Sequence, residues 1–365
     1  MRSMTATHHF SLYWGLAPFA WLYEGITSLR NLLFDKGLLS AESYPLPVIC
    51  VGNLAVGGTG KTPHVEYLVR LLSPHYRVAV LSRGYKRKTK GYLLADDSAT
   101  SESIGDEPFQ LKRKFPQLLI AVSEKRQIGM RQLLALPAER RPEVVLLDDA
   151  FQHRYVKPSL SILLTDSHRL YSRDAVLPVG RLREAAQGAR RADLVVVTKC
   201  EPLPSIAEKE AIRQELALRD NQPLFFSEIR YGDLRPLFPD EAPSCSLRTI
   251  EDAELLLLTG IAHPEPLEQE LRRYASKLHT VAFPDHHAFT PADEKRIAEA
   301  FSSLRDERKR IVVTEKDAAR LYACSWLPAE WRKRLYLLPI EIGLDEQTAF
   351  DRLILRHVAA WKEYE

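Results

Sequence analysis

Residues 48–63 read VICVGNLAVGGTGKTP and decide the fold of this chain. An apolar run enters a glycine-rich loop, the loop ends in Lys61 and Thr62, and a helical pattern follows over residues 64–72. Such a loop lets backbone N–H groups approach a phosphate, and the start of the helix adds its dipole. Lys61 can reach the β and γ oxygens of a nucleotide, and the Thr62 hydroxyl can hold Mg²⁺. We therefore predict a nucleotide phosphate site made of Gly57, Gly58, Thr59, Gly60, Lys61, Thr62 and Pro63. The alternative is a glycine-rich turn without a ligand, and Ala55 departs from the loop pattern, which has glycine there.

Short apolar runs bounded by turn residues recur along the chain, with helical stretches between them. Continuous runs of Val, Ile and Leu are typical of strands that are covered on both faces, as in the parallel sheet of an α/β domain. We therefore predict an α/β fold, with a mostly parallel sheet of the P-loop NTPase type flanked by helices. The runs lie at residues 47–51, 77–81, 118–122, 144–147, 161–165 and 194–198.

The chain is long enough for more than one domain, since its 365 residues exceed the ~150 residues of an ordinary domain. Around residues 223–235 apolar and polar residues alternate, which indicates a β-linker or a hairpin. New α/β signals follow between residues 254 and 314, so we expect a smaller second α/β lobe. We divide the chain into an N-terminal helix (1–40), a phosphate-binding core (41–225), a smaller lobe (226–345) and a C-terminal docking helix (346–365).

The first forty residues are rich in aromatic and aliphatic side chains. Pro18, Glu24 and Arg30 interrupt them before the ~20 apolar residues that a membrane span needs, and no signal-peptide cleavage pattern follows. Aromatic rings suit the head-group boundary of a bilayer, beside a polar face with charged residues. We expect a membrane-interfacial helix, and a helix packed on the main domain is the open alternative. The rings belong to Tyr13, Trp14, Trp21 and Tyr23, and the polar face carries Glu24, Arg30 and Lys36.

The composition is that of a globular protein, with 45% hydrophobic and 27% charged residues. A net charge of +3 gives no support for a nucleic-acid partner. The four cysteines lack metal-ligand spacing and fit a reducing compartment. Basic residues nevertheless cluster at 83–90 and 112–114, where they form either a solvated surface or a site for phosphate or anionic lipid head groups.

A second chemical motif closes the apolar run at residues 144–147, where Asp148 and Asp149 follow. Ligands bind beyond the carboxyl ends of strands in such sheets, and carboxylates there can ligate Mg²⁺ directly or through water. The alternative is a pair of turn or cap residues. Together with the glycine-rich loop, the pair predicts ATP and Mg²⁺ as cofactors of a kinase or nucleotide hydrolase. The two motifs do not choose the phosphate acceptor.

Eight short blocks follow one another along nearly the whole chain. They are Gly52-Asn53 leading into GGTGKTP (57–63), LSRGY (81–85), GDEP (105–108), DDAFQH (148–153), LPVGRLRE (177–184), VTK (197–199), PDH (284–286) and VTEKD (313–317). In this order they resemble the tetraacyldisaccharide 4′-kinase family, the lipid A 4′-kinases of Gram-negative bacteria. Two positions depart from the family pattern: Ala150 replaces a glycine, which matters if that position needs positive φ, and Ala185 replaces a proline.

The resemblance implies transfer of the γ-phosphate of ATP to the 4′-hydroxyl of a tetraacyldisaccharide 1-phosphate, a lipid A precursor. It implies that Asp106 is the base for the sugar hydroxyl and that His286 of the second lobe is its partner. Taken alone, Asp106 can equally cap a helix and His286 can be a packed side chain. The expected metal shell is Thr62, Asp148, Asp149 and Glu107, and the expected substrate contacts are Arg83, Tyr85, His153, Arg181 and Arg183, for each of which a surface role stays open.

A lipid acceptor gives the aromatic N-terminus a purpose, because the enzyme must reach a head group whose acyl chains stay in the membrane. The expected partners are the disaccharide lipid and the inner-membrane surface, with the protein peripheral on the cytoplasmic face. Neither a nucleic acid nor an obligatory protein partner is expected. Three alternatives remain: a nucleotide switch, an ATP-dependent ligase that forms an acyl phosphate, and a membrane-associated scaffold. A nucleotide switch would need an Asn-Lys-x-Asp motif, and residues 197–201 match that motif only in part.

Overall fold

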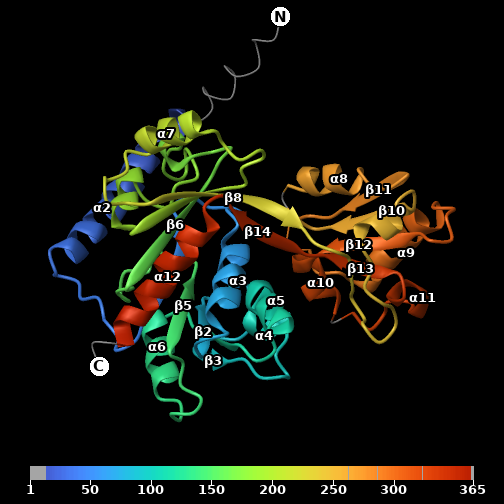
Figure 1. The fold of residues 1–365 in the computed structure, drawn as a ribbon, viewed down its shortest axis with the longest axis horizontal. Coiled ribbons are helices and arrows are strands. Elements are labelled where there is room, and N and C mark those ends of the chain that lie inside the picture. The colour runs from blue at the N-terminus through green and yellow to red at the C-terminus, as the bar shows by residue number, and fades with distance from the viewer. Residues whose placement is uncertain (1–13, 262, 286, 323, 363–365) are drawn as a thin grey trace, which may run out of the picture.

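The computed structural model describes residues 14–261, 263–285, 287–322 and 324–362, which form a larger and a smaller α/β lobe (Figure 1). The larger lobe contains a nine-stranded sheet in the order β14-β8-β7-β6-β1-β5-β2-β4-β3 among these residues. Its strands are parallel except for the outer pairs β14/β8 and β3/β4. They are β1 (Val48–Asn53), β2 (Val78–Ser82), β3 (Leu93–Leu94), β4 (Leu119–Val122), β5 (Val144–Asp148), β6 (Leu160–Asp166), β7 (Leu194–Thr198), β8 (Leu224–Tyr231) and β14 (Ile340–Leu344).

The larger sheet is buried on both faces, as the continuous apolar runs predict. All six residues of β1 are buried, with Ile49 in one hydrophobic cluster and Cys50 in the other. Helices α3 (Lys61–Leu72) and α12 (Gln347–Lys362) cover the face of Ile49, and α6 (Arg126–Leu134) and α7 (Ile206–Glu215) cover the face of Cys50. Alternate strand residues point to opposite faces, and each face is covered by helices, which is the arrangement of a parallel α/β sheet. The predicted fold class is therefore confirmed.

The smaller lobe has its own sheet in the order β11-β10-β12-β13-β9 among the described residues. All strand pairs are parallel except β13/β9. The strands are β9 (Arg235–Pro236), β10 (Glu254–Thr259), β11 (Lys277–Ala282), β12 (Arg310–Thr314) and β13 (Leu335–Leu338), and the helices are α8 (Glu265–Leu271), α9 (Pro291–Ser302), α10 (Glu315–Leu321) and α11 (Ala329–Arg332).

Two strands far apart in the sequence connect the lobes. β8 leaves the larger sheet and β14 returns to it, and they pair antiparallel from Ser227↔Leu344 to Tyr231↔Ile340. The alternating pattern at 223–235 is thus half of a two-stranded linker and not a hairpin. After β14, helix α12 packs back on the larger lobe, where the Phe350 ring lies 5.2 Å from that of Phe225. The boundaries at 40, 225 and 345 stay predictions.

Three further helices position the site. Helix α2 (Ala17–Asp35) lies on the larger lobe, preceded by a short 3₁₀ turn, η1 (Trp14–Leu16). Helices α4 (Ser101–Ile104) and α5 (Asp106–Lys114) lie on the side of the larger lobe that faces α10 (Figure 1). Among the helices of the described ranges, none combines the length and the hydropathy that crossing a bilayer requires.

Candidate active site

The glycine-rich loop connects β1 to α3 and is open. Gly60 caps α3 with φ of 79°, and Gly57 has φ of 117°. Both values favour glycine, because a Cβ atom strains the backbone in this region. A Cβ on Gly57 or Gly58 would meet no atom of the described residues within 4 Å. Ala55 stands before this curve and pairs antiparallel with Leu182. The alanine at this position therefore does not alter the part of the loop, residues 57–60, that would surround a phosphate.

Buried hydrogen bonds hold the loop in shape. Asn53 Nδ2 donates to Thr59 Oγ1 at 2.8 Å, and Thr198 Oγ1 donates to the Thr59 carbonyl at 3.1 Å. His64 Nδ1 lies 2.7 Å from the Gly60 carbonyl, which can only accept, so Nδ1 carries the proton. Burial lowers the pKa of His64 to about 4. The loop is thus fixed by neutral groups and not by its cationic side chain, Lys61.

The two predicted metal carboxylates lie where β5 ends, beside this loop. Lys61 Nζ lies 3.8 Å and Arg183 Nη1 lies 2.9 Å from Asp149 Oδ1. Burial acts to raise the pKa of Asp149, but the charges of Lys61 and Arg183 outweigh it and the pKa is lowered. Asp149 also takes the positive φ of this turn, at 47°. Ala150 is therefore tolerated in place of glycine, since the unusual conformation belongs to its neighbour.

Asp148 is the more deeply placed carboxylate, with 1% of its surface exposed. Its Oδ2 accepts a hydrogen bond from Ser82 Oγ at 3.1 Å, and its Oδ1 is buried without a partner among the described residues. Burial, together with the negative charges of Glu107 and Asp149, raises the pKa of Asp148 to about 7. The site therefore stabilises added positive charge at Asp148.

The donor set fits Mg²⁺. This ion prefers oxygen ligands and in nucleotide sites takes one or two carboxylates together with phosphate oxygens and water. Asp148 Oδ1, which has no hydrogen-bond partner among the described residues, is such an oxygen. The negative charges of Glu107 and Asp149 raise the pKa of Asp148, so both also act on this carboxylate. Within the part of the chain that the structure describes, no cluster of three or more His, Cys, Asp or Glu residues forms a complete cation site. The protein ligands and the phosphates would share the ion.

Asp106 occupies the first helical position of α5 and does not cap it, because Gly105 is the N-cap. Its carboxylate reaches the smaller lobe instead: Oδ2 accepts from Arg320 Nε at 2.9 Å. The predicted partner, His286, lies outside the described residues. The neighbouring His287 has a structural part, since it stacks on Phe283 with ring centroids 4.6 Å apart.

The predicted substrate residues differ in how closely they approach the site. Arg183 is drawn into the site by Asp149, and the segment that carries it runs along the loop, where Val56 N donates to the Arg181 carbonyl at 2.8 Å. The Arg181 side chain is exposed, as are Arg83 and Tyr85 after β2. His153 is half-buried, and burial together with the charge of Arg126 lowers its pKa to about 4. His153 is thus a neutral group.

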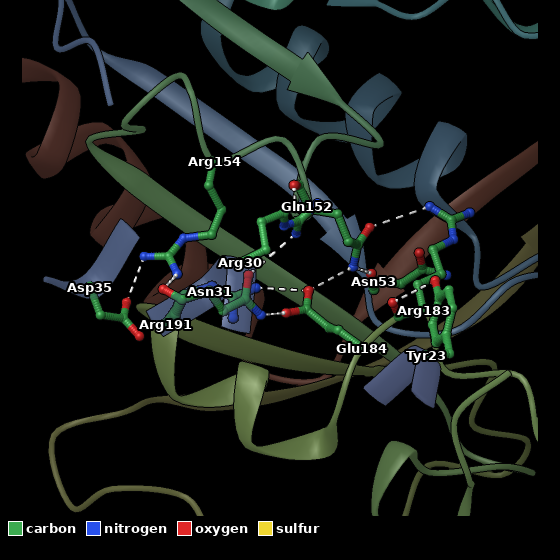
Figure 2. Close-up of polar contacts among 10 residues, drawn as sticks. All are labelled: Tyr23, Arg30, Asn31, Asp35, Asn53, Gln152, Arg154, Arg183, Glu184 and Arg191. Carbon is green, nitrogen blue, oxygen red and sulfur yellow. Dashed lines mark hydrogen bonds and ion pairs between the residues drawn. The ribbon is translucent and has the colours of Figure 1, made fainter. Parts of the chain in front are cut away.

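Side chains of helix α2 form hydrogen bonds with residues of the site (Figure 2). Tyr23 OH donates to the Arg183 carbonyl at 2.9 Å, and Arg30 Nη2 donates to the Gln152 carbonyl at 3.2 Å. Asn31 Nδ2 donates to Glu184 Oε2 at 2.6 Å. The expectation that Tyr23 and Arg30 belong to the membrane-facing or solvated surface was wrong, because these half-buried side chains donate to backbone carbonyls of the larger lobe. Tyr13 and the Trp14 side chain lie outside the described residues.

Sequence reasoning missed three residues that shape the site. Gln152 Nε2 donates to the Asn53 carbonyl at 2.8 Å and to Glu184 Oε1 at 3.1 Å, which ties the turn after β5 to the loop after β1. Both Gln152 and Glu184 lie inside the family blocks, and that was their only signal. Arg126, 2% exposed, donates to the Asp148 carbonyl at 3.2 Å and lies in none of the blocks.

Comparisons with known proteins identify the family of the chain. The family model described as "Tetraacyldisaccharide-1-P 4'-kinase" matches residues 12–359. A "Tetraacyldisaccharide 4'-kinase" from Parabacteroides distasonis is 53% identical over 346 residues, 94% of each chain. A protein of the same name from Bacteroides thetaiotaomicron is 47% identical over 363 residues, covering 96% of this chain and 94% of its own.

A solved structure agrees as well. The crystal structure of LpxK from Aquifex aeolicus in complex with ATP superimposes with a TM-score of 0.75 at 32% identity, over 95% of this chain and 99% of that one. The resemblance indicated by the eight blocks is confirmed, and the chain belongs to the tetraacyldisaccharide 4′-kinase family.

Proposed function

We propose that this chain is a kinase that transfers the γ-phosphate of ATP to the 4′-hydroxyl of a tetraacyldisaccharide 1-phosphate, the lipid precursor of lipid A. The observation that carries the proposal is the meeting of an open phosphate loop with Lys61, Asp149 and the orphaned Asp148 oxygen at one sheet edge. Family membership supports the choice of acceptor.

Positioning and charge do most of the work in phosphoryl transfer. The loop amides and Lys61 hold the β and γ oxygens, and Arg183 lies close enough to Asp149 to join them as charge develops. Mg²⁺, held by Asp148 with Thr62, Asp149 and Glu107 nearby, would neutralise the phosphate charge. Asp106 receives the proton of the acceptor hydroxyl, with His286 as its expected partner from the second lobe.

A direct assay tests the proposal. The protein is incubated with γ-labelled ATP, Mg²⁺ and a monophosphorylated disaccharide lipid in detergent, and we expect label at the 4′ position of the distal sugar. A lipid already phosphorylated at that position is the matched control and should take no label. Release of labelled inorganic phosphate at the same rate with and without the lipid would identify a nucleotide hydrolase and refute the proposal.

The outer face of α2 supports docking on a membrane surface. Its large apolar side chains are between 46% and 72% exposed, whereas the opposite face binds the site residues described above. Contiguous exposed apolar residues on a helix suit burial at the head-group boundary. We propose that this face lies on the cytoplasmic side of the inner membrane. The exposed residues are Phe19, Trp21, Leu22, Ile26, Leu29 and Leu32.

Replacing Phe19, Leu22 and Ile26 together by Asp should abolish most co-sedimentation with phospholipid vesicles, because three carboxylates cannot enter the apolar boundary. Activity on a detergent-dispersed acceptor should stay within a few fold, since the inner face of α2 is untouched. The matched control is Ile206→Asp, a change of an apolar side chain that is 86% exposed on α7. Equal sedimentation of the triple variant and this control would contradict the docking face.

A further inference from the structure

We propose that Arg320 is a positioning residue of the kinase site: from the smaller lobe it fixes the carboxylate of Asp106, so that α10 helps to build the site. The inference rests on the proposed role of Asp106 as the base for the acceptor hydroxyl. It gives the smaller lobe a second contribution to the reaction, separate from that expected of His286.

The contact is a two-pronged one. Arg320 Nε and Nη2 each lie 2.9 Å from Asp106 Oδ2. The Arg320 side chain is 7% exposed and that of Asp106 is 20% exposed. The guanidinium is planar and presents its donors in a rigid fork, so two donors on one oxygen restrict rotation of the carboxylate. A lysine in this place would supply charge without the fork.

Arg320 is itself held in place by an ion pair within the smaller lobe. Its Nη1 donates to Asp317 Oδ1 at 3.1 Å, and Asp317 is fully buried. The other oxygen, Asp317 Oδ2, accepts from Gly260 N at 3.1 Å and from Thr314 Oγ1 at 2.7 Å. A continuous run of bonds therefore leads from the end of β10, through the start of α10, to Asp106. Since buried networks of this kind are rigid when satisfied, Arg320 can impose a direction on Asp106.

The far end of the same helix pair provides an internal comparison. Lys114, at the C-terminal end of α5, lies 2.6 Å from Glu315 at the start of α10 and 2.5 Å from Glu66 of α3. Helices α5 and α10 thus run antiparallel, with ion pairs at both ends. At the Arg320 end, the C-cap residue Tyr322 packs on Phe109 of α5 with ring centroids 6.4 Å apart. Lys114 is 7% exposed, so this member of the basic cluster at 112–114 holds the lobes together and is not part of an anionic surface site.

Fixing Asp106 in this way is compatible with its proposed role. Phosphoryl transfer depends strongly on positioning, so the carboxylate that receives the hydroxyl proton must also be held in line with the attacking oxygen. Errors of about 1 Å in such orientation can cost roughly 10²-fold in rate. A positioning arginine therefore favours turnover more than substrate binding.

The test compares the two ends of the α5–α10 contact. Arg320→Met should lower kcat by about 10- to 100-fold and leave the KM for ATP nearly unchanged, and Arg320→Lys should recover part of the loss. Lys114→Met breaks the other end, and Tyr322→Leu weakens the apolar packing beside Arg320 without removing a charge. Both should lower the melting temperature while kcat stays within a few fold. Equal kcat losses at both ends, or an unchanged kcat in Arg320→Met, would overturn the inference.

A double-mutant cycle separates this inference from the function on which it rests. In the Asp106→Asn background, Arg320→Met should add little further loss, because the proton acceptor that Arg320 positions has been removed. Fully multiplicative losses would overturn the positioning role. If Asp106→Asn alone kept its turnover, the proposed role of Asp106 would fail. If Asp106→Asn were inactive and Arg320→Met fully active, only the inference about Arg320 would fail.

Discussion

Asp106→Asn should reduce turnover by roughly 10²- to 10⁴-fold, the range that general bases contribute, while ATP binds almost as well as before. Asparagine keeps the shape of the side chain and can still meet Arg320, but it cannot accept the hydroxyl proton. Asp106 also lies on α5 and outside the phosphate loop, so the phosphates keep their ligands. Single-turnover transfer to the lipid and equilibrium binding of ATP would measure the two effects separately.

The matched control is Asp97→Asn, which removes a carboxylate whose side chain is fully exposed and whose cation partner is Lys112. It should leave turnover unchanged. A loss of only a few fold in Asp106→Asn, or equal losses of turnover and ATP affinity, would show that Asp106 is not the base.

Lys61→Ala should damage both ATP binding and turnover, with a rate loss on the order of 10²- to 10³-fold, as for the removal of one transition-state donor. The reason is that Lys61 would contact the same phosphate oxygens before and during transfer. It is also one of the three cations, with Arg183 and Arg126, that lower the pKa of Asp149. The measurements are titration with ATP and Mg²⁺, and steady-state transfer at saturating acceptor.

Lys88→Ala is the control for loss of a positive charge, because the Lys88 side chain is 74% exposed and pairs with Glu102 on the surface. Its kinetics should match those of the unmodified enzyme. If Lys61→Ala bound ATP normally and lost as little activity as Lys88→Ala, the loop would not be the phosphate site.

The glycine-rich loop and the larger sheet could be predicted because their signals are local, whereas the binding of phosphate by the loop stays a prediction. In β1, alternate residues such as Ile49 and Cys50 enter opposite hydrophobic clusters, so the whole strand must be apolar and the pattern is readable. The positive φ values at Gly57 and Gly60 likewise have a local cause in the residue type. For Asp148, the position at a strand end was enough to predict a place beside the loop, whereas its role as a ligand stays a prediction.

Other parts of the site had no local signal. Tyr23 looked like an interfacial ring, and only the packing of α2 on the larger lobe turns its hydroxyl to the Arg183 carbonyl. Lys114 looked like part of a basic surface, yet it is enclosed by Glu66 and Glu315, which lie 48 and 201 residues away in the sequence. Nothing near Arg320 pointed to Asp106, which is 214 residues away.

The sequence by itself therefore determined the class of fold, the position of the glycine-rich loop and the family, because each depends on residues that are close together or on an ordered set of blocks. Only the tertiary structure decided which side chains share the site: α5 with α10, and α2 with the turn after β5 (Figures 1 and 2). The physical reason is that an ion pair or hydrogen bond acts over about 3 Å. Partners across such a distance are chosen by how the helices pack and not by their separation along the chain.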